Sequence, residues 1–422
     1  MDFNVKYDLS IKYKNMPLRL LHFSDIHFYN YKDARWDKDR EIQNEIIQDL
    51  SRVLKDDSTQ INHILICGDI AFSGKDEEYE DASQWINNVC LKTGCENQNI
   101  FLIPGNHDVN RSQISLACNE LRSVLREQNI EKYDDLLEKA WLRKEDKDVL
   151  LLPFIPYYKF VKKYQIEHDH ICCDRILDID GVYKLKIRGI NSALLSYIPE
   201  LDDDPNHDMA KLCIGEIQAL ISTHEENVIH LSMCHHPIQW LKDGETIKKL
   251  LDSRASIQLF GHEHNAKTEC KENILKIYSG AMQPSRSEHP YEPVYNIIDI
   301  SIENEKMKVA INSRRWSIDT RTFEEAEKVI YELEPDLRKS IINNRKQSQN
   351  IKKTDESKVW YEYFSMKNPL EQLQIGKELN VTSNEDELLP MLDRVDLIYK
   401  RLREQNRLVE LLTLIGTKYA GK

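Results

Sequence analysis

The hydrophobic residues of this chain gather in short runs that end at polar or turn residues. Runs of about four to eight apolar residues, rich in branched side chains, are typical of strands buried inside a sheet. Such runs predict strands at 18–23, 63–67, 100–103, 183–190, 228–233, 257–260, 274–278 and 294–300. Apolar residues at helical spacing lie between the first three of these runs, over 37–54 and over 77–89.

This alternation of strand and helix is typical of an α/β fold with helices on the faces of a sheet. The runs between 274 and 312 follow one another without a helix, which favours antiparallel pairing there. We therefore expect two sheets of mixed strand direction rather than one doubly wound sheet. Residues 112–170 interrupt the pattern with a charged helical stretch, which predicts an insertion or cap near the functional site.

The C-terminal part of the chain has a different character. After residue 322 it reads as polar helix without a further strand-like run, and 340–358 contains few apolar residues. From 385 onward, leucine, isoleucine and valine recur at i+3 and i+4 steps, which indicates a small all-α module. The expected division is an α/β domain at 1–322, a helical or polar linker at 323–384 and a C-terminal module at 385–422.

Composition and charge narrow the class of protein. Of the 422 residues 41% are hydrophobic, which is enough for a substantial core, and the formal net charge of −13 gives no general attraction to nucleic acid or anionic membranes. The nine cysteines form no CxxC pair, so a zinc ribbon or a disulfide scaffold is not expected and a reducing compartment fits best. No apolar stretch approaches membrane-spanning length. We expect a cytoplasmic protein without membrane contact.

Polar side chains that can bind metals follow five of the predicted strands. The segments are DIH, GD, GNHD, HH and GHEH, and in most of them a glycine precedes the polar residues. Asp25 and His27 are two residues apart, so in extended chain they point to the same side and can hold one ion. Mixed imidazole and oxygen ligands suit Mn²⁺, Fe, Zn²⁺ or Co²⁺, and a carboxylate such as Asp69 can bridge two cations. The sequence therefore predicts two divalent metal ions at the edge of a sheet.

The order DIH, GDIAFSG, GNHD, HHP and GHEH resembles that of the calcineurin-like metallophosphoesterases over roughly residues 17–320. The form GD-x-x-x-SG is most similar to the branch with bacterial cyclic-nucleotide and glycerophosphodiester phosphodiesterases. The resemblance implies a four-layer sandwich, in which two mixed sheets lie face to face with helices outside. It also implies a dinuclear site at the carboxyl ends of the strands, with Mn²⁺ as the expected metal.

The resemblance further implies a role for each residue at the strand ends. His107 would contact a phosphoryl oxygen or protonate the leaving group, and Asp108 would orient its imidazole. Arg111 and His236 are candidates for substrate contact, although a surface position for Arg111 and a neighbouring, non-ligating position for His236 fit equally well. The implied ligands are Asp25, His27, Asp69 and His264 for one ion and Asp69, Asn106, His235 and His262 for the other.

The expected activity is hydrolysis of a nucleotide-type or small phosphodiester by metal-activated hydroxide. Repair nucleases of the same family share these ligands, so a metal-dependent nuclease acting on DNA or RNA, as in a bacterial defence effector, is the alternative. The negative charge argues against a processive nuclease, whereas the 112–170 insertion could form a groove. A protein phosphatase is more distant, because that branch carries GD-x-x-D-R-G instead.

The predicted C-terminal helices leave a non-enzymatic alternative open. Residues 387–415 are faintly similar to the effector-associated domains of bacterial conflict-system proteins. These helices could also form a homo-oligomer, bind a protein partner or pack on the catalytic domain. A scaffold that works through them predicts that variants without metal ligands keep their biological activity.

Overall fold

The computed structural model describes residues 16–29, 39–56, 60–164, 171–196, 208–221, 225–284 and 290–337, together with 369–383 and scattered positions up to 414. The chain divides into two compact units, Met1–Ser340 and Ile341–Lys422. The described part of the second unit includes helix α12 (Pro369–Glu378). Most of the C-terminal module expected at 385–422 lies outside the described residues.

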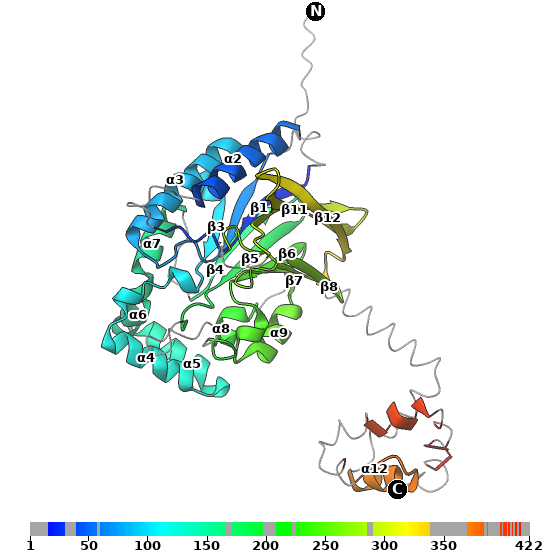
Figure 1. The fold of residues 1–422 in the computed structure, drawn as a ribbon. Coiled ribbons are helices and arrows are strands. Elements are labelled where there is room, and N and C mark those ends of the chain that lie inside the picture. Colours follow the sequence, from blue (N-terminus) through cyan, green and yellow to red (C-terminus); the bar gives the residue numbers. More distant parts are fainter. Residues whose placement is uncertain are drawn as a thin grey trace, which may run out of the picture. The chain divides into compact units, whose positions relative to one another are not determined.

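Two six-stranded sheets form the framework of the first unit (Figure 1). The first sheet has the order β12-β11-β10-β1-β2-β3 and the second the order β4-β5-β6-β7-β9-β8. The strands are β1 (Leu18–Phe23), β2 (His63–Cys67), β3 (Ile100–Ile103), β4 (Cys173–Asp178), β5 (Lys184–Ile190), β6 (Val228–Cys234), β7 (Ala255–Phe260), β8 (Lys267–Lys271), β9 (Ile274–Tyr278), β10 (Val294–Glu303), β11 (Lys306–Ser317) and β12 (Thr322–Leu333). All the strands expected from hydrophobic runs are therefore present.

Both sheets mix parallel and antiparallel strands, as expected. Strands β1, β2 and β3 are parallel, whereas β10, β11 and β12 continue the same sheet in antiparallel order. In the second sheet β5, β6, β7 and β9 are parallel, and β4 and β8 are its antiparallel edges. The expectation of antiparallel pairing from residue 274 holds for β10 onward. Strand β9 belongs to the other sheet, where it pairs antiparallel with β8 and parallel with β7.

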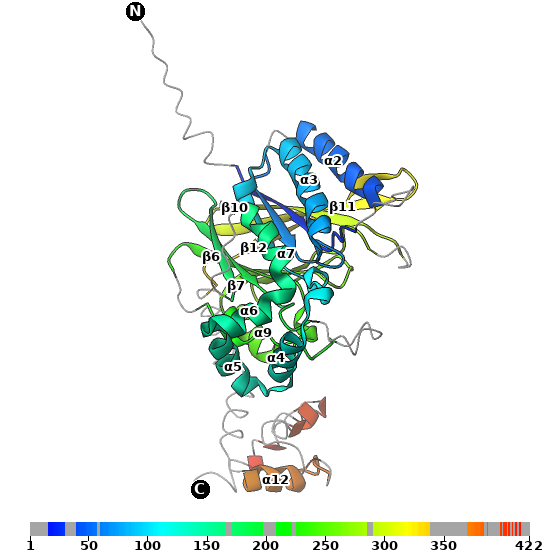
Figure 2. The ribbon, with the colours of Figure 1, turned by 90° about the vertical axis from the view of Figure 1, so that its left-hand side faces the viewer.

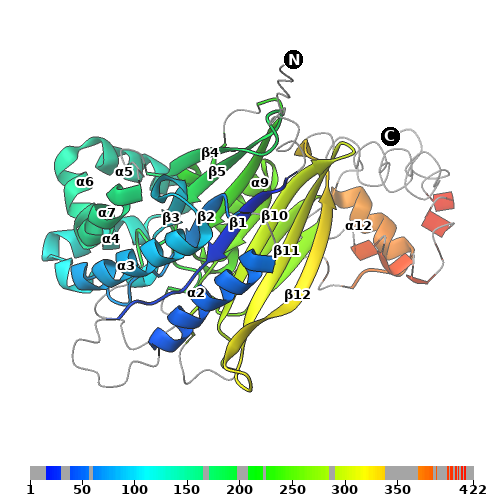
Figure 3. The ribbon, with the colours of Figure 1, turned by 90° about the horizontal axis from the view of Figure 1, so that it is seen from above.

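Helices cover the outer face of each sheet, which confirms the four-layer sandwich (Figures 2 and 3). Ile46 and Trp85, from the two helices on the first sheet, belong to the main hydrophobic core, and Ile247 and Leu251 pack against the second sheet. The helices are α2 (Asp39–Asp56), α3 (Asp76–Thr93), α4 (Leu116–Glu127), α5 (Ile130–Leu142), α6 (Lys144–Leu151), α7 (Ile155–Val161), α8 (Glu216–Ala219) and α9 (Gly244–Asp252). None of the described helices is long and apolar enough to cross a membrane.

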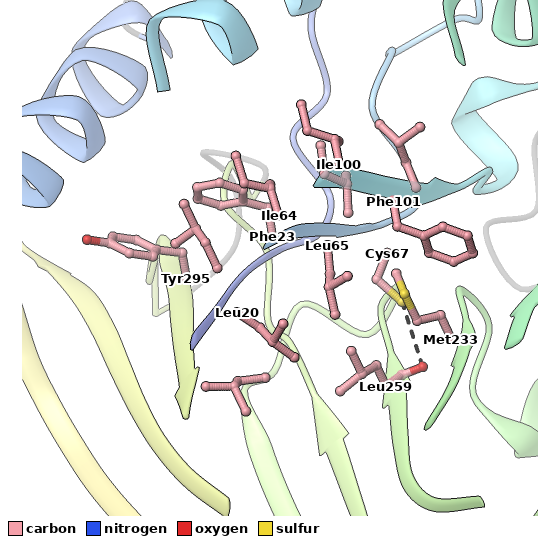
Figure 4. Packing of buried hydrophobic residues seen from close by; sticks show 14 of the residues in the cluster. Leu20, Phe23, Ile64, Leu65, Cys67, Ile100, Phe101, Met233, Leu259 and Tyr295 are labelled. Carbon is pink, nitrogen blue, oxygen red and sulfur yellow. Dashed lines mark hydrogen bonds between the residues drawn. The ribbon is translucent and has the colours of Figure 1, made fainter. Parts of the chain in front are cut away.

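The core between the sheets explains why the central strands are apolar on both faces. Leu20, Leu65 and Met233 lie between the two sheets, whereas Phe23 and Ile64 point toward the helices (Figure 4). Side chains alternate between the faces of a strand, so a strand covered on both sides favours apolar residues at most of its positions. The charged stretch at 112–170 contains α4 to α7. Helices α4, α5 and α6 contribute to a second, smaller hydrophobic cluster, whereas Tyr157 and Phe160 of α7 belong to the main core.

Residues 323–333 were expected to be helical or polar linker, and that expectation is wrong. They form most of β12, which pairs with β11 at the edge of the first sheet. An edge strand leaves much of its surface in water, so it can carry charged residues such as Glu324, Glu325 and Glu327. The polar strands β4 and β8, at the two edges of the second sheet, were missed for the same reason.

A buried ion pair fastens α2 to the first sheet, and its loss should destabilise the fold. The Asp49 carboxylate is fully buried, accepts a hydrogen bond from Tyr295 Oη at 2.6 Å and accepts two from Arg314, at 2.7 and 2.8 Å. Asp49→Ala leaves Arg314 in the core without its anion. We expect the free energy of unfolding to fall by about 3–5 kcal/mol, measured by urea denaturation.

The matched control is Glu303→Ala, which removes the partner of Lys308 from an exposed ion pair on the same sheet. Exposed pairs of this kind contribute about 1 kcal/mol or less. Equal effects of the two substitutions would show that the Asp49 pair does not fasten the helix.

Candidate metal centre

The five predicted segments meet at one end of the sandwich. Each directly follows the carboxyl end of a parallel strand, namely β1, β2 and β3 in the first sheet and β6 and β7 in the second. Hydrogen bonds join the turns, for example from Asp25 N to Gly68 O at 3.1 Å and from Gly261 N to His235 O at 2.9 Å. Parallel strands bring their ends to the same edge, so residues distant in sequence become neighbours there.

The recurring glycines are required by close contacts between these turns. A Cβ atom on Gly105 would lie 2.2 Å from Asp69 Oδ1, and one on Gly68 would lie 2.4 Å from His235 Nδ1. A Cβ atom on Gly261 would lie 2.3 Å from Ser24 Oγ. Any side chain at these positions would displace a candidate ligand or its neighbour. The glycine that precedes Asp69, Asn106 and His262 in the sequence is thus explained by packing at the site.

Several of the expected ligands adopt the left-handed backbone conformation. This region is unfavourable for residues other than glycine, at about 1 kcal/mol or more each, and such residues concentrate at functional sites. The φ angles are 53° for Asp25, 52° for His27, 52° for Asp69, 69° for His262 and 46° for His264. The turns therefore hold these side chains in place at a cost in backbone energy.

Asp25, His27 and His264 form the first group that could hold an ion. One potential ligand atom from each lies within 4.8 Å of the others, and His264 Nε2 is 3.5 Å from Asp25 Oδ1. Asp25 Oδ2 accepts hydrogen bonds from Ser24 Oγ at 2.5 Å and His262 N at 3.2 Å. Oδ1 is buried and has no hydrogen-bond partner within the described residues. A buried carboxylate oxygen without a donor is costly, and a cation beside it would remove that cost.

Asp69 lies between this group and a second one, which is formed by His235, His236 and His262. Its Oδ2 is 3.2 Å from His235 Nε2 and 4.0 Å from His27 Nε2, so the carboxylate faces both sides. Asn106 Oδ1 lies 3.2 Å from the same His235 nitrogen. The other ring nitrogen of His235, Nδ1, is 2.8 Å from the Cys67 carbonyl oxygen. Since a carbonyl only accepts, Nδ1 carries the proton and Nε2 is left to face the site.

The protonation states of three proposed ligands match those that metal binding needs, and that of His235 does not. Burial lowers the pKa of His27 to about 3, and repulsion by His107 adds to this effect. Burial also lowers the pKa of His262 to about 3. For Asp25 burial acts in the opposite direction, but the nearby His264 and His235 imidazoles prevail and bring the pKa to about 2. For His235 burial lowers the pKa, but the Asp69 and Asp25 carboxylates prevail and raise it to about 9, so a bound cation would replace a proton there. Neutral imidazoles and ionised carboxylates are the forms that bind a cation, and His27, His262 and Asp25 are already in these forms. The residues present therefore fit a metal site.

His107 lies at this site, but Asp108 does not orient it. His107 Nδ1 is 2.8 Å from the carbonyl oxygen of Phe72, so the backbone of the GDIAFSG segment sets the imidazole. The buried Asp108 carboxylate instead accepts hydrogen bonds from Ala71 N at 3.0 Å, Gly105 N at 2.9 Å and Tyr79 Oη at 2.8 Å. Asp108 therefore joins two of the turns, and the role expected for it from the sequence is wrong.

Of the two candidates for substrate contact, only His236 joins the ligand groups. It is fully buried, and one of its nitrogens lies within 4.8 Å of ligand atoms of His235 and His262. Its Nδ1 is 2.8 Å from Ser192 Oγ, whereas its Nε2 has no hydrogen-bond partner among the described residues. Arg111 is exposed at the start of a short 3₁₀ helix, Arg111–Gln113.

Trp240 is part of the site and was missed by the sequence analysis. Its ring centroid lies 4.1 Å from that of His262, at an interplanar angle of 86°. His236 packs on another side of His262, with ring centroids 4.5 Å apart. The two rings fix the orientation of the His262 imidazole. Trp240 lies in a short 3₁₀ helix, Ile238–Trp240, and no motif or periodicity in the sequence marks it.

Comparison with known proteins identifies the family to which the chain belongs. Residues 18–266, more than half of the chain, match the family of calcineurin-like phosphoesterases. The uncharacterized metallophosphoesterase-like protein YydB of Bacillus subtilis (strain 168) is 25% identical over 317 residues. That alignment covers 70% of this chain but only 59% of the relative, so the chain spans less than two thirds of that protein.

Two solved structures are similar at low TM-scores. The purple acid phosphatase PPD1 of yellow lupin (Lupinus luteus) has a TM-score of 0.40 at 11% identity, over 75% of this chain and 54% of that chain. A putative 5′-nucleotidase from Staphylococcus aureus has a TM-score of 0.36 at 10% identity, over 75% and 54% respectively. At this low similarity the fold assignment rests on the strand order and layers described above.

Proposed function

Since this chain belongs to the calcineurin-like phosphoesterase family, we propose that it is a metal-dependent phosphoesterase, and more narrowly a phosphodiesterase acting on a nucleotide-type or small phosphodiester. The observation that supports this most directly is the position of Asp69 between two groups of ligand atoms, each no wider than 4.8 Å. An arrangement with one shared carboxylate is suited to two cations, roughly 3.5–4 Å apart in hydrolases of this type.

The proposed ligands come from both sheets. We assign Asp69 as the shared ligand, because its Oδ2 faces His27 on one side and His235 on the other. Mn²⁺ is the proposed metal, since imidazole nitrogens and carboxylate oxygens are both acceptable to it. The proposed sets are Asp25, His27, Asp69 and His264 for one ion and Asp69, Asn106, His235 and His262 for the other.

When bound, two such cations neutralise the phosphoryl oxygens and lower the pKa of bound water from about 16 towards 7. The residues of the chain supply positioning and proton transfer. His107 donates from Nδ1 to the Phe72 carbonyl, so proton transfer to the leaving oxygen falls to Nε2. His236 and Trp240 both pack against the His262 imidazole and hold its orientation. Asp108 keeps the turn that carries His107 in register with the turn that carries Asp69.

The proposal is tested by assaying the Mn²⁺-loaded protein on a panel of phosphoesters. The panel contains cyclic nucleotides, a chromogenic diester, the matching monoester, single- and double-stranded DNA, and RNA. We expect diesters to be hydrolysed faster than the monoester and polymers to remain intact. The His107→Ala protein, purified in the same way, controls for contaminating hydrolases.

Two other outcomes would change the assignment. Degradation of DNA or RNA, absent with His107→Ala, would favour the nuclease over the small-molecule phosphodiesterase. A protein that binds two metal ions but hydrolyses no ester on the panel would contradict the enzymatic proposal and favour the scaffold.

A further inference from the structure

Two exposed aromatic side chains stand beside the proposed catalytic residue. Phe72 is 44% exposed and Tyr29 is 45% exposed, and their rings lie 5.2 Å apart at an interplanar angle of 78°. Among the large hydrophobic side chains that are exposed in the described ranges, these are the only aromatic ones. Exposed hydrophobic residues that occur singly need no explanation, but an exposed aromatic pair at a reaction site does.

The backbone holds this pair firmly. Phe28 N donates to Ile70 O at 2.8 Å, and Phe72 N donates to Phe28 O at 3.0 Å. These bonds, together with a parallel bridge between Phe28 and Ala71, extend the pairing of β1 and β2 beyond the metal ligands. Tyr29 and Phe72 are therefore neighbours because their two chain segments are joined.

The pair adjoins the groups proposed to act on the phosphoester. The Phe72 ring centroid lies 5.2 Å from that of His107 and 6.2 Å from that of His27. The Phe72 carbonyl also sets the His107 imidazole through Nδ1. A planar group attached to the reacting phosphate, on the side of His107, would meet the aromatic pair, because the Phe72 ring packs directly beside the His107 ring.

Nucleobases are the common planar groups that lie one sugar away from a phosphodiester. A base stacked on an aromatic side chain contributes about 1–3 kcal/mol and needs no hydrogen bonds that would restrict which base is bound. We propose that Phe72 and Tyr29 form a stacking surface for the base of the substrate, so that the site prefers base-bearing phosphodiesters to ring-free ones. This inference rests on the proposed phosphodiesterase function and specifies its substrate class.

The test compares binding of AMP and ribose 5-phosphate to the Mn²⁺-loaded protein by calorimetry. The two compounds differ only by the base, so their affinity ratio reports stacking. We expect AMP to bind about ten-fold or more tightly than ribose 5-phosphate. Phe72→Ala should weaken AMP by about the same factor and leave ribose 5-phosphate unchanged, whereas Phe72→Trp should keep the preference. The Phe72 carbonyl, which fixes His107 Nδ1, remains in both variants. Phe72→Trp also keeps an aromatic ring beside His107, so it controls for loss of the ring contact.

The control substitution is Leu91→Ala, which removes an 82% exposed hydrophobic side chain from α3 and should change neither affinity. Equal affinities for AMP and ribose 5-phosphate in the unmodified protein would overturn the stacking surface. So would a Phe72→Ala protein that retains the preference for AMP.

Hydrolysis assays separate this inference from the proposed function. Adenylyl-adenosine carries a base beside its diester, whereas glycerophosphoethanolamine has no ring. Equal turnover of the two would overturn the inference and leave the phosphodiesterase standing, and no turnover of either would overturn the phosphodiesterase. A short single-stranded DNA provides the second source of the same chemistry. If Phe72→Ala weakens binding of this DNA as it weakens binding of AMP, the surface binds a nucleic-acid strand. If the substitution does not affect DNA binding, the surface binds a small nucleotide.

Discussion

Replacement of Asp69 by alanine should abolish the binding of a metal pair and lower kcat/KM on a diester by at least about 10⁴-fold. Asp69 is the residue whose Oδ2 faces His27 on one side and His235 on the other, at 4.0 and 3.2 Å. Bound cations supply several kcal/mol to hydrolysis of an anionic ester, and each ~1.4 kcal/mol is a factor of ten in rate. Metal content by elemental analysis and turnover of a chromogenic diester check the two parts of this expectation.

Asp69→Ala also has a structural effect that needs a control. Asp69 has a φ angle of 52° and accepts a hydrogen bond from His107 N at 2.8 Å, and alanine supports neither feature well. Asp69→Asn keeps a residue that tolerates the left-handed region and still offers an oxygen, but without the charge. We expect this variant to fold normally and to lose the pair as well. Asp319→Ala, at an exposed turn, should change nothing. Two ions still bound by Asp69→Asn would contradict the assignment of Asp69 as the shared ligand.

Replacement of His107 by alanine should have a different signature, because this residue is proposed to move a proton rather than to bind metal. Its imidazole is set by the Phe72 carbonyl at 2.8 Å. General acid–base groups typically contribute about 10²–10⁴-fold to turnover. We expect kcat to fall by that amount while two ions per chain remain bound. The loss should be smaller for a diester with a good leaving group, such as p-nitrophenol, which needs little protonation.

The sharpest comparison for His107 is with His27, whose ring centroid is only 4.7 Å away. His27→Ala should lose an ion, because His27 is one of the proposed ligands of the first site. Alanine in place of His27 is thus expected to impair metal binding, whereas alanine in place of the adjacent His107 is expected to impair proton transfer. Loss of metal in His107→Ala, or full metal content in His27→Ala, would show that the two roles have been exchanged.

How much of the fold the sequence predicts depends on how the strands are buried. β1 reads as a mostly apolar run, interrupted by Arg19 and His22, because every one of its positions is buried, and its limits are those expected from the sequence. β8 is exposed along almost its whole length, and β12 carries a row of exposed acidic residues in its first half. A search for apolar runs detects strands covered on both faces, whereas edge strands are specified by pairing with a neighbour distant in sequence.

The candidate site shows a similar limit. The order of the motifs is enough to place seven candidate ligands at one end of the sandwich, because parallel strands align their ends. Asp108 was misjudged because Asn106–Asp108 form a 3₁₀ turn, in which successive side chains point in different directions. His107 points to the site, and Asp108 points into the protein toward Ala71 and Tyr79. Trp240 could not be found, because its contact with His262 is created only by the pairing of β6 with β7.

The left-handed turns at the metal centre also bear on how such a protein can change over generations. Aspartate, asparagine and histidine are the residues other than glycine that tolerate this conformation best. The residue types that can bind a cation here are therefore also those that the backbone conformation accepts. An exchange of Asp25 or Asp69 for asparagine removes the charge that a cation needs and leaves the turn in a conformation it accepts. Activity can therefore vanish from a descendant in one step while the fold persists. Lineages that inherit these turns are expected to include folded proteins that have ceased to be enzymes.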